Sequence, residues 1–247
     1  MKICAIDSSG LVASVAIVED DITVAEYSIQ YKITHSQTLL PMLAEILERI
    51  GMNIADVDAW AISAGPGSFT GLRIGVATVK GLGIAVPKPV VSVPTLEALA
   101  YNAYGSGAVI CPIMDARRHQ VYTGLYEFVY DDAKQAYRMQ IIQGQQACDF
   151  AEICEQINSI GREVIFIGDG IPVYSGEMDE LISVPYSCAP AHMNRQRAGA
   201  LAALAELYLQ GQADDLEGQV TTADELAPEY LRLSQAEREK KERAGEA

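Results

Sequence analysis

The chain turns sharply at the sequence Gly65-Pro66-Gly67-Ser68-Phe69-Thr70-Gly71-Leu72-Arg73-Ile74-Gly75. The apolar residues 57–63 before it predict a buried strand, and the small and apolar residues 71–86 after it predict a helix. Its first two glycines permit backbone angles that a side chain would forbid, and the hydroxyl of Ser68 or Thr70 can cap the helix. The junction therefore predicts a tight strand-to-helix turn, whose helix N-terminus is also suited to an anion or a partner protein.

This junction lacks the two common nucleotide-binding patterns. A P-loop requires Gly-Lys-Ser or Gly-Lys-Thr, and the chain contains neither. A dinucleotide-binding loop requires G-x-G-x-x-G, but Thr70 stands where the third glycine belongs, and residues 89–93 supply no acidic residue for a ribose. Both nucleotide-binding loops, and with them a Rossmann-type reductase, are disfavoured.

Bulk composition narrows the class of protein. A chain of 247 residues with 49% hydrophobic residues predicts one or two domains with a real core. The net charge of −15 argues against broad, unaided binding of nucleic acid, although a basic partner could hold RNA. The five cysteines are odd in number and form no C-x-x-C pair, which fits a reducing cytosol. Because the N-terminus runs directly into a strand and residues 74–86 are too short to span a membrane, we expect a cytoplasmic protein.

The expected elements fall into two halves that open alike. Strands are expected at 2–7, 11–18, 22–31, 57–63, 89–93, 108–114, 121–130, 137–142 and 163–168, and helices at 35–50, 71–86, 94–104, 149–158 and 194–210. The glycine-rich residues 105–107 mark the boundary. We expect an N-terminal lobe over 1–105, a C-terminal lobe over 106–233 that ends in a docked extended segment, and a charged, disordered tail over 234–247.

Short segments in the same order resemble those of the bacterial TsaB (YeaZ) family over nearly the whole chain. These segments are Ile6-Asp7-Ser8-Ser9, His35-Ser36-Gln37-Thr38-Leu39-Leu40-Pro41, Gly65 to Gly75, Met114-Asp115-Ala116-Arg117-Arg118 with Gln120-Val121-Tyr122, Gly168-Asp169-Gly170, and Pro228-Glu229-Tyr230-Leu231-Arg232. The family is the non-catalytic partner in making threonylcarbamoyladenosine on tRNA.

The first of these segments also resembles the actin/Hsp70/sugar-kinase superfamily, in which the first turn approaches ATP phosphates and a metal. The same residues equally make an ordinary hairpin turn. With the family resemblance we expect an α/β, actin/Hsp70/sugar-kinase-like fold with two lobes, each a mixed sheet flanked by helices. The resemblance places near a nucleotide the residues Asp7, Ser8, Ser9, Gly168 and Gly170, of which the last two equally fit a strand-to-helix turn.

The helix at 71–86 carries small residues on more than one face. Ala77, Gly81 and Ala85 repeat every four residues, and each helical glycine costs up to about 1 kcal/mol relative to alanine. Packing on its own sheet accounts for one face, so we infer that this helix and helix 35–50 also pack against another subunit. The resemblance implies that these helices form a homodimer and the contact with the catalytic subunit TsaD. The expected interface residues are His35, Leu39, Met42, Gly71, Arg73, Ile74, Ala77, Gly81 and Ala85.

Catalytic chemistry is disfavoured. The catalytic relative TsaD binds its metal through H-x-x-x-H after the strand that matches 89–93, but no histidine occurs here between His35 and His119. The chain also lacks the G-x-S-x-G elbow of a Ser–His–Asp hydrolase. We therefore expect no catalytic residue, no metal ligand and no cofactor of its own.

The expected function is that of a scaffold in tRNA modification. The resemblance implies a subunit that activates TsaD, together with the ATPase TsaE, for threonylcarbamoylation of adenosine 37 in tRNAs that read codons beginning with A. It implies an adenine nucleotide at the junction with TsaD and an indirect contact with tRNA. The alternative is an ATP-dependent small-molecule kinase, which needs an Asp-Gly-Gly or Gly-Gly-Thr turn where Asp115-Ala116-Arg117-Arg118 stands.

That charged turn leaves two interpretations open. Asp115, Arg117 and Arg118 form either a contact for phosphate, a partner or tRNA, or a solvated ion pair. His119 fits an exposed turn residue, and His35 fits a cap or an interface side chain.

Overall fold

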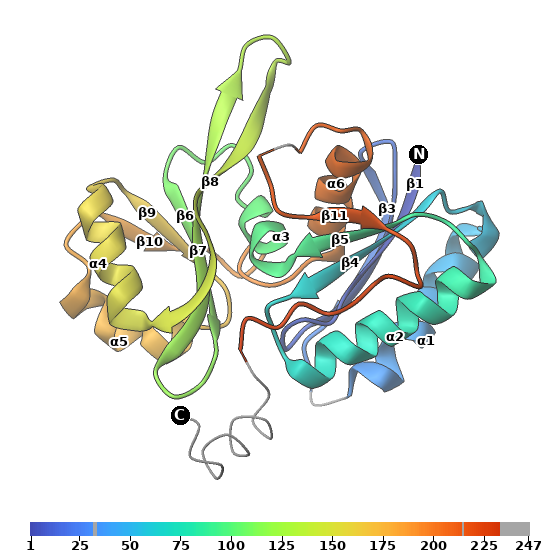
Figure 1. Cartoon of the computed structure of the whole chain (residues 1–247), viewed down its shortest axis with the longest axis horizontal. Coiled ribbons are helices and arrows are strands. Elements are labelled where there is room, and N and C mark those ends of the chain that lie inside the picture. Colours follow the sequence, from blue (N-terminus) through green and yellow to red (C-terminus); the bar gives the residue numbers. More distant parts are fainter. Residues whose placement is uncertain (32–33, 214, 233–247) are drawn as a thin grey trace.

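Two lobes lie side by side in the computed structural model, which describes residues 1–31, 34–213 and 215–232 (Figure 1). The first sheet has the order β11-β5-β4-β1-β2-β3, and the second has the order β10-β9-β6-β7-β8. Each sheet combines parallel and antiparallel pairs and carries helices on its faces. The expected α/β fold with two lobes, each a mixed sheet flanked by helices, is confirmed.

The first sheet opens with two hairpins and continues with parallel pairs. Its strands are β1 (Lys2–Asp7), β2 (Ala13–Glu19), β3 (Ile22–Ile29), β4 (Ala59–Gly65), β5 (Val90–Pro94) and β11 (Gln219–Thr221). β4 pairs in parallel with both β1 and β5. A 3-10 turn, η1 (Ile54–Asp56), precedes β4.

Side chains along β1 alternate between the two faces of this sheet, so both faces carry apolar residues and both are covered by helices. Cys4 and Ile6 pack with α1 (His35–Ile50) and α2 (Phe69–Ala85), whereas Ile3 and Ala5 pack with α3 (Thr95–Tyr101) and α6 (Ala198–Leu209). α1 continues through Pro41. No helix in the described part of the chain is long and apolar enough to cross a membrane.

The second sheet repeats the arrangement. Its strands are β6 (Val109–Asp115), β7 (Gln120–Asp131), β8 (Ala136–Asp149), β9 (Val164–Ile167) and β10 (Tyr186–Cys188), and its helices are α4 (Phe150–Ile160) and α5 (Ile171–Leu181). Cys111 and Ile113 face α4 and α5, while Ile110 and Met114 join the same core as α3 and α6. One apolar core therefore runs from the first lobe into the second.

The structure differs from the expected assignment of 106–233 to the second lobe. α6 packs against β1 and β2, and β11 adds to β5 of the first sheet. The reason is that Leu201, Leu204 and Ala205 cover the face of the first sheet that α1 and α2 leave open. The tail over 234–247 lies outside the described residues.

Candidate functional site

The strand-to-helix junction is packed against the turn that follows β1. The backbone N–H of Ser68 donates to the Ser9 carbonyl at 2.7 Å. A Cβ at Gly67 would lie 2.2 Å from that same oxygen, and one at Gly71 would lie 2.1 Å from the Ser8 carbonyl. Gly71 is therefore buried inside the chain, and its expected place on a partner interface is wrong. The glycines are required because two backbones approach each other here.

The C-terminal segment was predicted to dock over residues 228–233, and its described part, 228–232, lies along the same junction. The Glu229 N–H donates to the Ala64 carbonyl at 2.8 Å. Tyr230 stacks on Phe69 with ring centroids 4.7 Å apart and accepts a hydrogen bond of 3.0 Å from Arg73 Nε. The Arg73 guanidinium also lies 3.9 Å from the centre of the Phe69 ring. Arg73 is thus exposed but already held by its own chain.

The outward face of α2 is lined with small residues. Ala77, Gly81 and Ala85 are exposed, and Ile84 beside them is 75% exposed. A Cβ at Gly81 would meet no atom of the described residues within 4 Å, whereas one at Gly83 would lie 2.4 Å from Ala223. The packing of this chain therefore requires glycine at 83 but not at 81. Binding of a partner to this face stays a prediction.

Helix α1 presents other residues outward than the sequence analysis expected. Leu39 and Met42 are 1% and 5% exposed and belong to the core under the sheet, so their expected contact with a partner is wrong. Leu40, Pro41 and Ala44 are apolar residues of that helix that are exposed. The sequence places apolar residues on two faces of α1, because Leu39 and Leu40 are adjacent. Only the packing shows which of the two faces is buried.

An interlobe cleft of about 680 Å³ lies beside this junction. It is lined by Ser9, Gly10, Leu11, Tyr31, Thr34, His35, Gly67, Ser68, Thr70, Gly71, Ile74, Met114, Asp115, Ala116, Arg117, Tyr122, Asp169, Pro172 and Val173. His35 and Ile74, both half-buried, line this cleft. The ring N–H at His35 Nε2 donates to the Gly10 carbonyl at 2.9 Å, and the Nδ1 atom has no hydrogen-bond partner among the described residues.

The acidic residue of the first turn is used internally. Asp7 is 1% exposed; its Oδ1 accepts from the Ser9 N–H at 2.9 Å and the Ser9 hydroxyl at 2.7 Å, and its Oδ2 accepts from the Ser63 hydroxyl. Burial raises the pKa of the Asp7 carboxyl. The Ser8 hydroxyl likewise donates inward, to the Gly71 carbonyl at 2.9 Å.

The glycines of the second lobe are also occupied by their own chain. A Cβ at Gly168 would lie 2.2 Å from the Ile113 carbonyl, and the Gly170 N–H donates to that oxygen at 3.0 Å. Of the residues expected near a nucleotide, Ser9 lines the cleft. Because the Asp7 oxygens and both glycines are engaged by the protein, these residues do not fit a nucleotide–metal site of the superfamily type.

The turn between β6 and β7 holds an uncommon backbone. Arg117, Arg118 and His119 have φ angles of 64°, 58° and 60°. A left-handed conformation costs an L-residue roughly 1–2 kcal/mol relative to the right-handed one. Arg117 pairs with Asp115 at 3.2 Å, and Arg232 donates to the Ala116 carbonyl at 2.6 Å. Arg117 thus lines the cleft, and Arg232 binds Ala116, which lines it too.

Comparison with known proteins agrees with this architecture. A family model described as "TsaD: tRNA N6-adenosine threonylcarbamoyltransferase" matches residues 26–240. The tRNA threonylcarbamoyladenosine biosynthesis protein TsaB of Bacillus subtilis (strain 168) is 32% identical over 237 residues, which cover 96% of this chain and 96% of that relative. The chain belongs to the TsaB family.

Other TsaB relatives support the assignment. The TsaB protein of Escherichia coli (strain K12) is 37% identical over 130 residues, 51% of this chain and 55% of that protein. The solved structure of YeaZ from Pseudomonas aeruginosa has a TM-score of 0.74 and 26% identity, and the match covers 93% of this chain and 99% of the other. Within the described ranges, no group of three or more His, Cys, Asp or Glu side chains could hold a metal ion. The expectation that this TsaB-family chain has no catalytic residue stays a prediction.

Proposed function

We propose that this chain is a non-catalytic subunit required for the threonylcarbamoylation of adenosine 37 in tRNAs that read codons beginning with A. It binds and activates TsaD, together with TsaE. Membership of the TsaB family supports the role in tRNA threonylcarbamoyladenosine biosynthesis, for which its relatives are named. The match to the TsaD family model supports descent from a transferase fold.

The observation that carries this proposal is the outward face of α2. The exposed run of Ala77, Gly81 and Ala85 allows the backbone of another helix to approach closely, and the exposed Ile84 adds apolar area. Since the chain's own packing leaves the space beside Gly81 open, the glycine is explained by a partner. The same face serves a homodimer and the complex with TsaD, so the two assemblies exclude each other.

In this proposal, the complex with TsaD binds the nucleotide and the tRNA. The proposal includes an adenine nucleotide at the junction with TsaD, which is supported by the internal hydrogen bonds that already engage the Asp7 carboxylate in this chain. With a net charge of −15, this chain leaves most of the electrostatic attraction for tRNA to its partner.

The test is the mass of the assemblies, measured by light scattering on wild type and Gly81→Leu, with and without TsaD from the same organism. The wild type is expected to be a dimer that exchanges into a heterodimer with TsaD. Gly81→Leu is expected to remain a monomer in both samples, because leucine occupies the space that the partner needs. The variant folds, since leucine at this exposed helical position has better helix propensity than glycine.

Gly176→Leu is the matched control. Gly176 is an exposed glycine inside α5, and a Cβ there also meets no atom of the described residues within 4 Å. It should gain similar helix stability and leave both masses unchanged. A wild-type monomer that is indifferent to TsaD would contradict the scaffold function, and ATP turnover by that monomer with a small-molecule acceptor would favour the kinase alternative.

A further inference from the structure

We propose that the β6–β7 turn, Arg117-Arg118-His119, is a direct contact site for the phosphodiester backbone of RNA. The identity of that RNA as a tRNA rests on the proposed function. The inference adds to it a surface on this chain that touches the RNA, whereas the scaffold function requires only an indirect role.

The backbone of the turn is unfavourable for the residues that it carries. All three residues have φ angles near +60°, a region in which glycine, asparagine and aspartate are favoured. Elsewhere in the described ranges, the non-glycine residues with positive φ are Asp20 and Asp21 of the β2–β3 turn, which are of a favoured type, and Gln135 of the β7–β8 turn, which is not. Arginine, which stands at 117 and 118, is not among the residue types that favour this region of φ. A strained turn that retains arginine is explained when the side chains themselves are needed.

The tip of the turn also carries exposed positive charge. The Arg117 side chain is 84% exposed although it pairs with Asp115, and Arg118 and His119 are also exposed. Arg232 adds a further guanidinium group, since it donates to the Ala116 carbonyl of the same turn. The carboxylates near this turn are Asp115, Asp149 and Asp169, whereas the three exposed residues of the tip itself include two arginines and no carboxylate. This is notable in a chain with a net charge of −15.

The chemistry of the exposed side chains favours RNA over an acidic protein as the ligand of this turn. Planar guanidinium groups bind phosphate oxygens in a bidentate geometry. The exposed side chains of the turn, Arg117, Arg118 and His119, are all polar, and a protein interface would require an apolar centre. A narrow tip with several guanidinium groups fits a single sugar–phosphate strand better than the roughly 800 Å² that each partner contributes to a stable protein interface.

The test is the double variant Arg117→Gly/Arg118→Gly. Glycine adopts the left-handed conformation without the steric cost that arginine has there, which offsets the greater entropy of its unfolded chain, so this variant should fold with a Tm at or slightly above that of the wild type. Binding of an unmodified tRNA transcript is measured by fluorescence anisotropy at several salt concentrations, with the chain alone at low salt and with the chain plus TsaD. We expect affinity to fall about tenfold, and the slope of log K against log salt to decrease by about 1–2.

Three variants serve as controls. Asp21→Gly places glycine at a position with a left-handed backbone in the first lobe and should not change the tRNA affinity. Arg162→Gln removes one positive charge before β9, which pairs with the start of β6, at the opposite end of the sheet from the turn. It should leave the tRNA affinity almost unchanged. The double lysine variant keeps the charge and should retain most of the binding.

The outcomes separate this inference from the proposed function. A folded glycine variant with unchanged tRNA affinity would overturn the inference, as would an equal loss of binding in Arg162→Gln. A variant that loses affinity for TsaD, while the chain alone binds tRNA as before, would make the turn a protein contact and overturn it too. If the wild type forms no complex with TsaD, the proposed function fails, and the titration of the chain alone still decides the inference.

Discussion

Glu97 is a single residue whose buried charge makes stability depend on pH. It is 0% exposed, accepts a hydrogen bond of 2.5 Å from the Tyr208 hydroxyl and one of 2.9 Å from the Glu217 N–H, and has a pKa raised to about 7, chiefly by burial. Between the usual value of 4.5 and about 7, the folded chain binds more protons at this site than the unfolded chain, so stability falls as pH rises. The loss totals about 3 kcal/mol. In urea unfolding at pH 5.5 and pH 8, Glu97→Gln should therefore lose less stability with rising pH than wild type. Parallel pH profiles for the two proteins would contradict this assignment.

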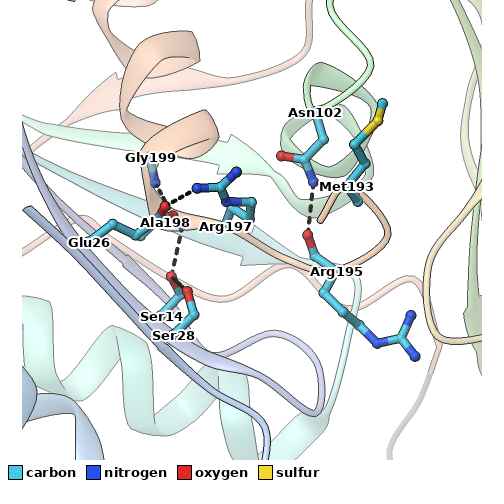
Figure 2. A network of polar contacts seen from close by, with 9 residues as sticks. All are labelled: Ser14, Glu26, Ser28, Asn102, Met193, Arg195, Arg197, Ala198 and Gly199. Carbon is cyan, nitrogen blue, oxygen red and sulfur yellow. Dashed lines mark hydrogen bonds and ion pairs between the residues drawn. The ribbon is translucent and has the colours of Figure 1, made fainter. Parts of the chain in front are cut away.

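The attachment of α6 to the first sheet is a property of one element and of the strands beneath it. Its N-cap residue, Arg197, makes no capping hydrogen bond through its side chain within the described residues. Figure 2 shows that the first lobe supplies the cap: Ser14 Oγ accepts from the Ala198 N–H and Glu26 Oε1 accepts from the Gly199 N–H, each at 2.9 Å. A carboxylate at a helix N-terminus also stabilises the helix dipole.

Removing this cap should weaken the attachment of α6. Ser14 is 0% exposed, so Ser14→Ala leaves the Ala198 N–H without its acceptor in the interior and should lower the free energy of unfolding by about 1–2 kcal/mol. Chemical denaturation measures the loss. Ser159→Ala is the control, because the Ser159 hydroxyl donates to a carbonyl of its own exposed helix and its removal should change stability by less than about 0.5 kcal/mol. Equal effects of the two changes would show that Ser14 does not act as a cap.

At the level of the whole molecule, the C-terminal segment ties the two lobes together. Glu229 binds the end of β4 in the first lobe, and Arg232 binds the β6–β7 turn in the second. Figure 1 shows this segment passing from α2 toward the second lobe. Tyr230 anchors it by stacking on Phe69.

Loss of the Tyr230 ring should release this segment without unfolding the protein. An aromatic pair contributes about 0.5–1.5 kcal/mol beyond its buried area, so Tyr230→Ala should speed hydrogen exchange of the Glu229 amide by roughly tenfold. Exchange in the centre of β1 should not change. Tyr31→Ala, which removes a tyrosine that is 75% exposed, is the control and should leave the Glu229 amide as in wild type. Unchanged exchange in Tyr230→Ala would mean that the backbone bonds alone hold the segment.

Local sequence patterns predicted most of the fold correctly. The strand-to-helix junction, the paired hairpins and the docked C-terminal segment follow from glycine, proline and apolar spacing, and the structure has each of them. The site was harder to predict, because neighbouring apolar residues are not equivalent: Leu39 is buried and Leu40 is half-exposed. A helix with apolar residues on two faces does not indicate which face meets its own sheet.

Sequence was thus sufficient for properties that depend on near neighbours along the chain: the order of most elements, the family and the small-residue stripe of α2. It did not predict α5, β10 or β11. Tertiary structure alone decided properties that depend on residues distant in sequence. In the folded chain, α6 and β11 belong to the first lobe, and the Ser63 hydroxyl donates a hydrogen bond to Asp7. Gly71 packs against Ser8 rather than against a partner. The physical reason is that burial and hydrogen-bond satisfaction are set by which surfaces meet, and the meeting surfaces here come from opposite ends of the chain.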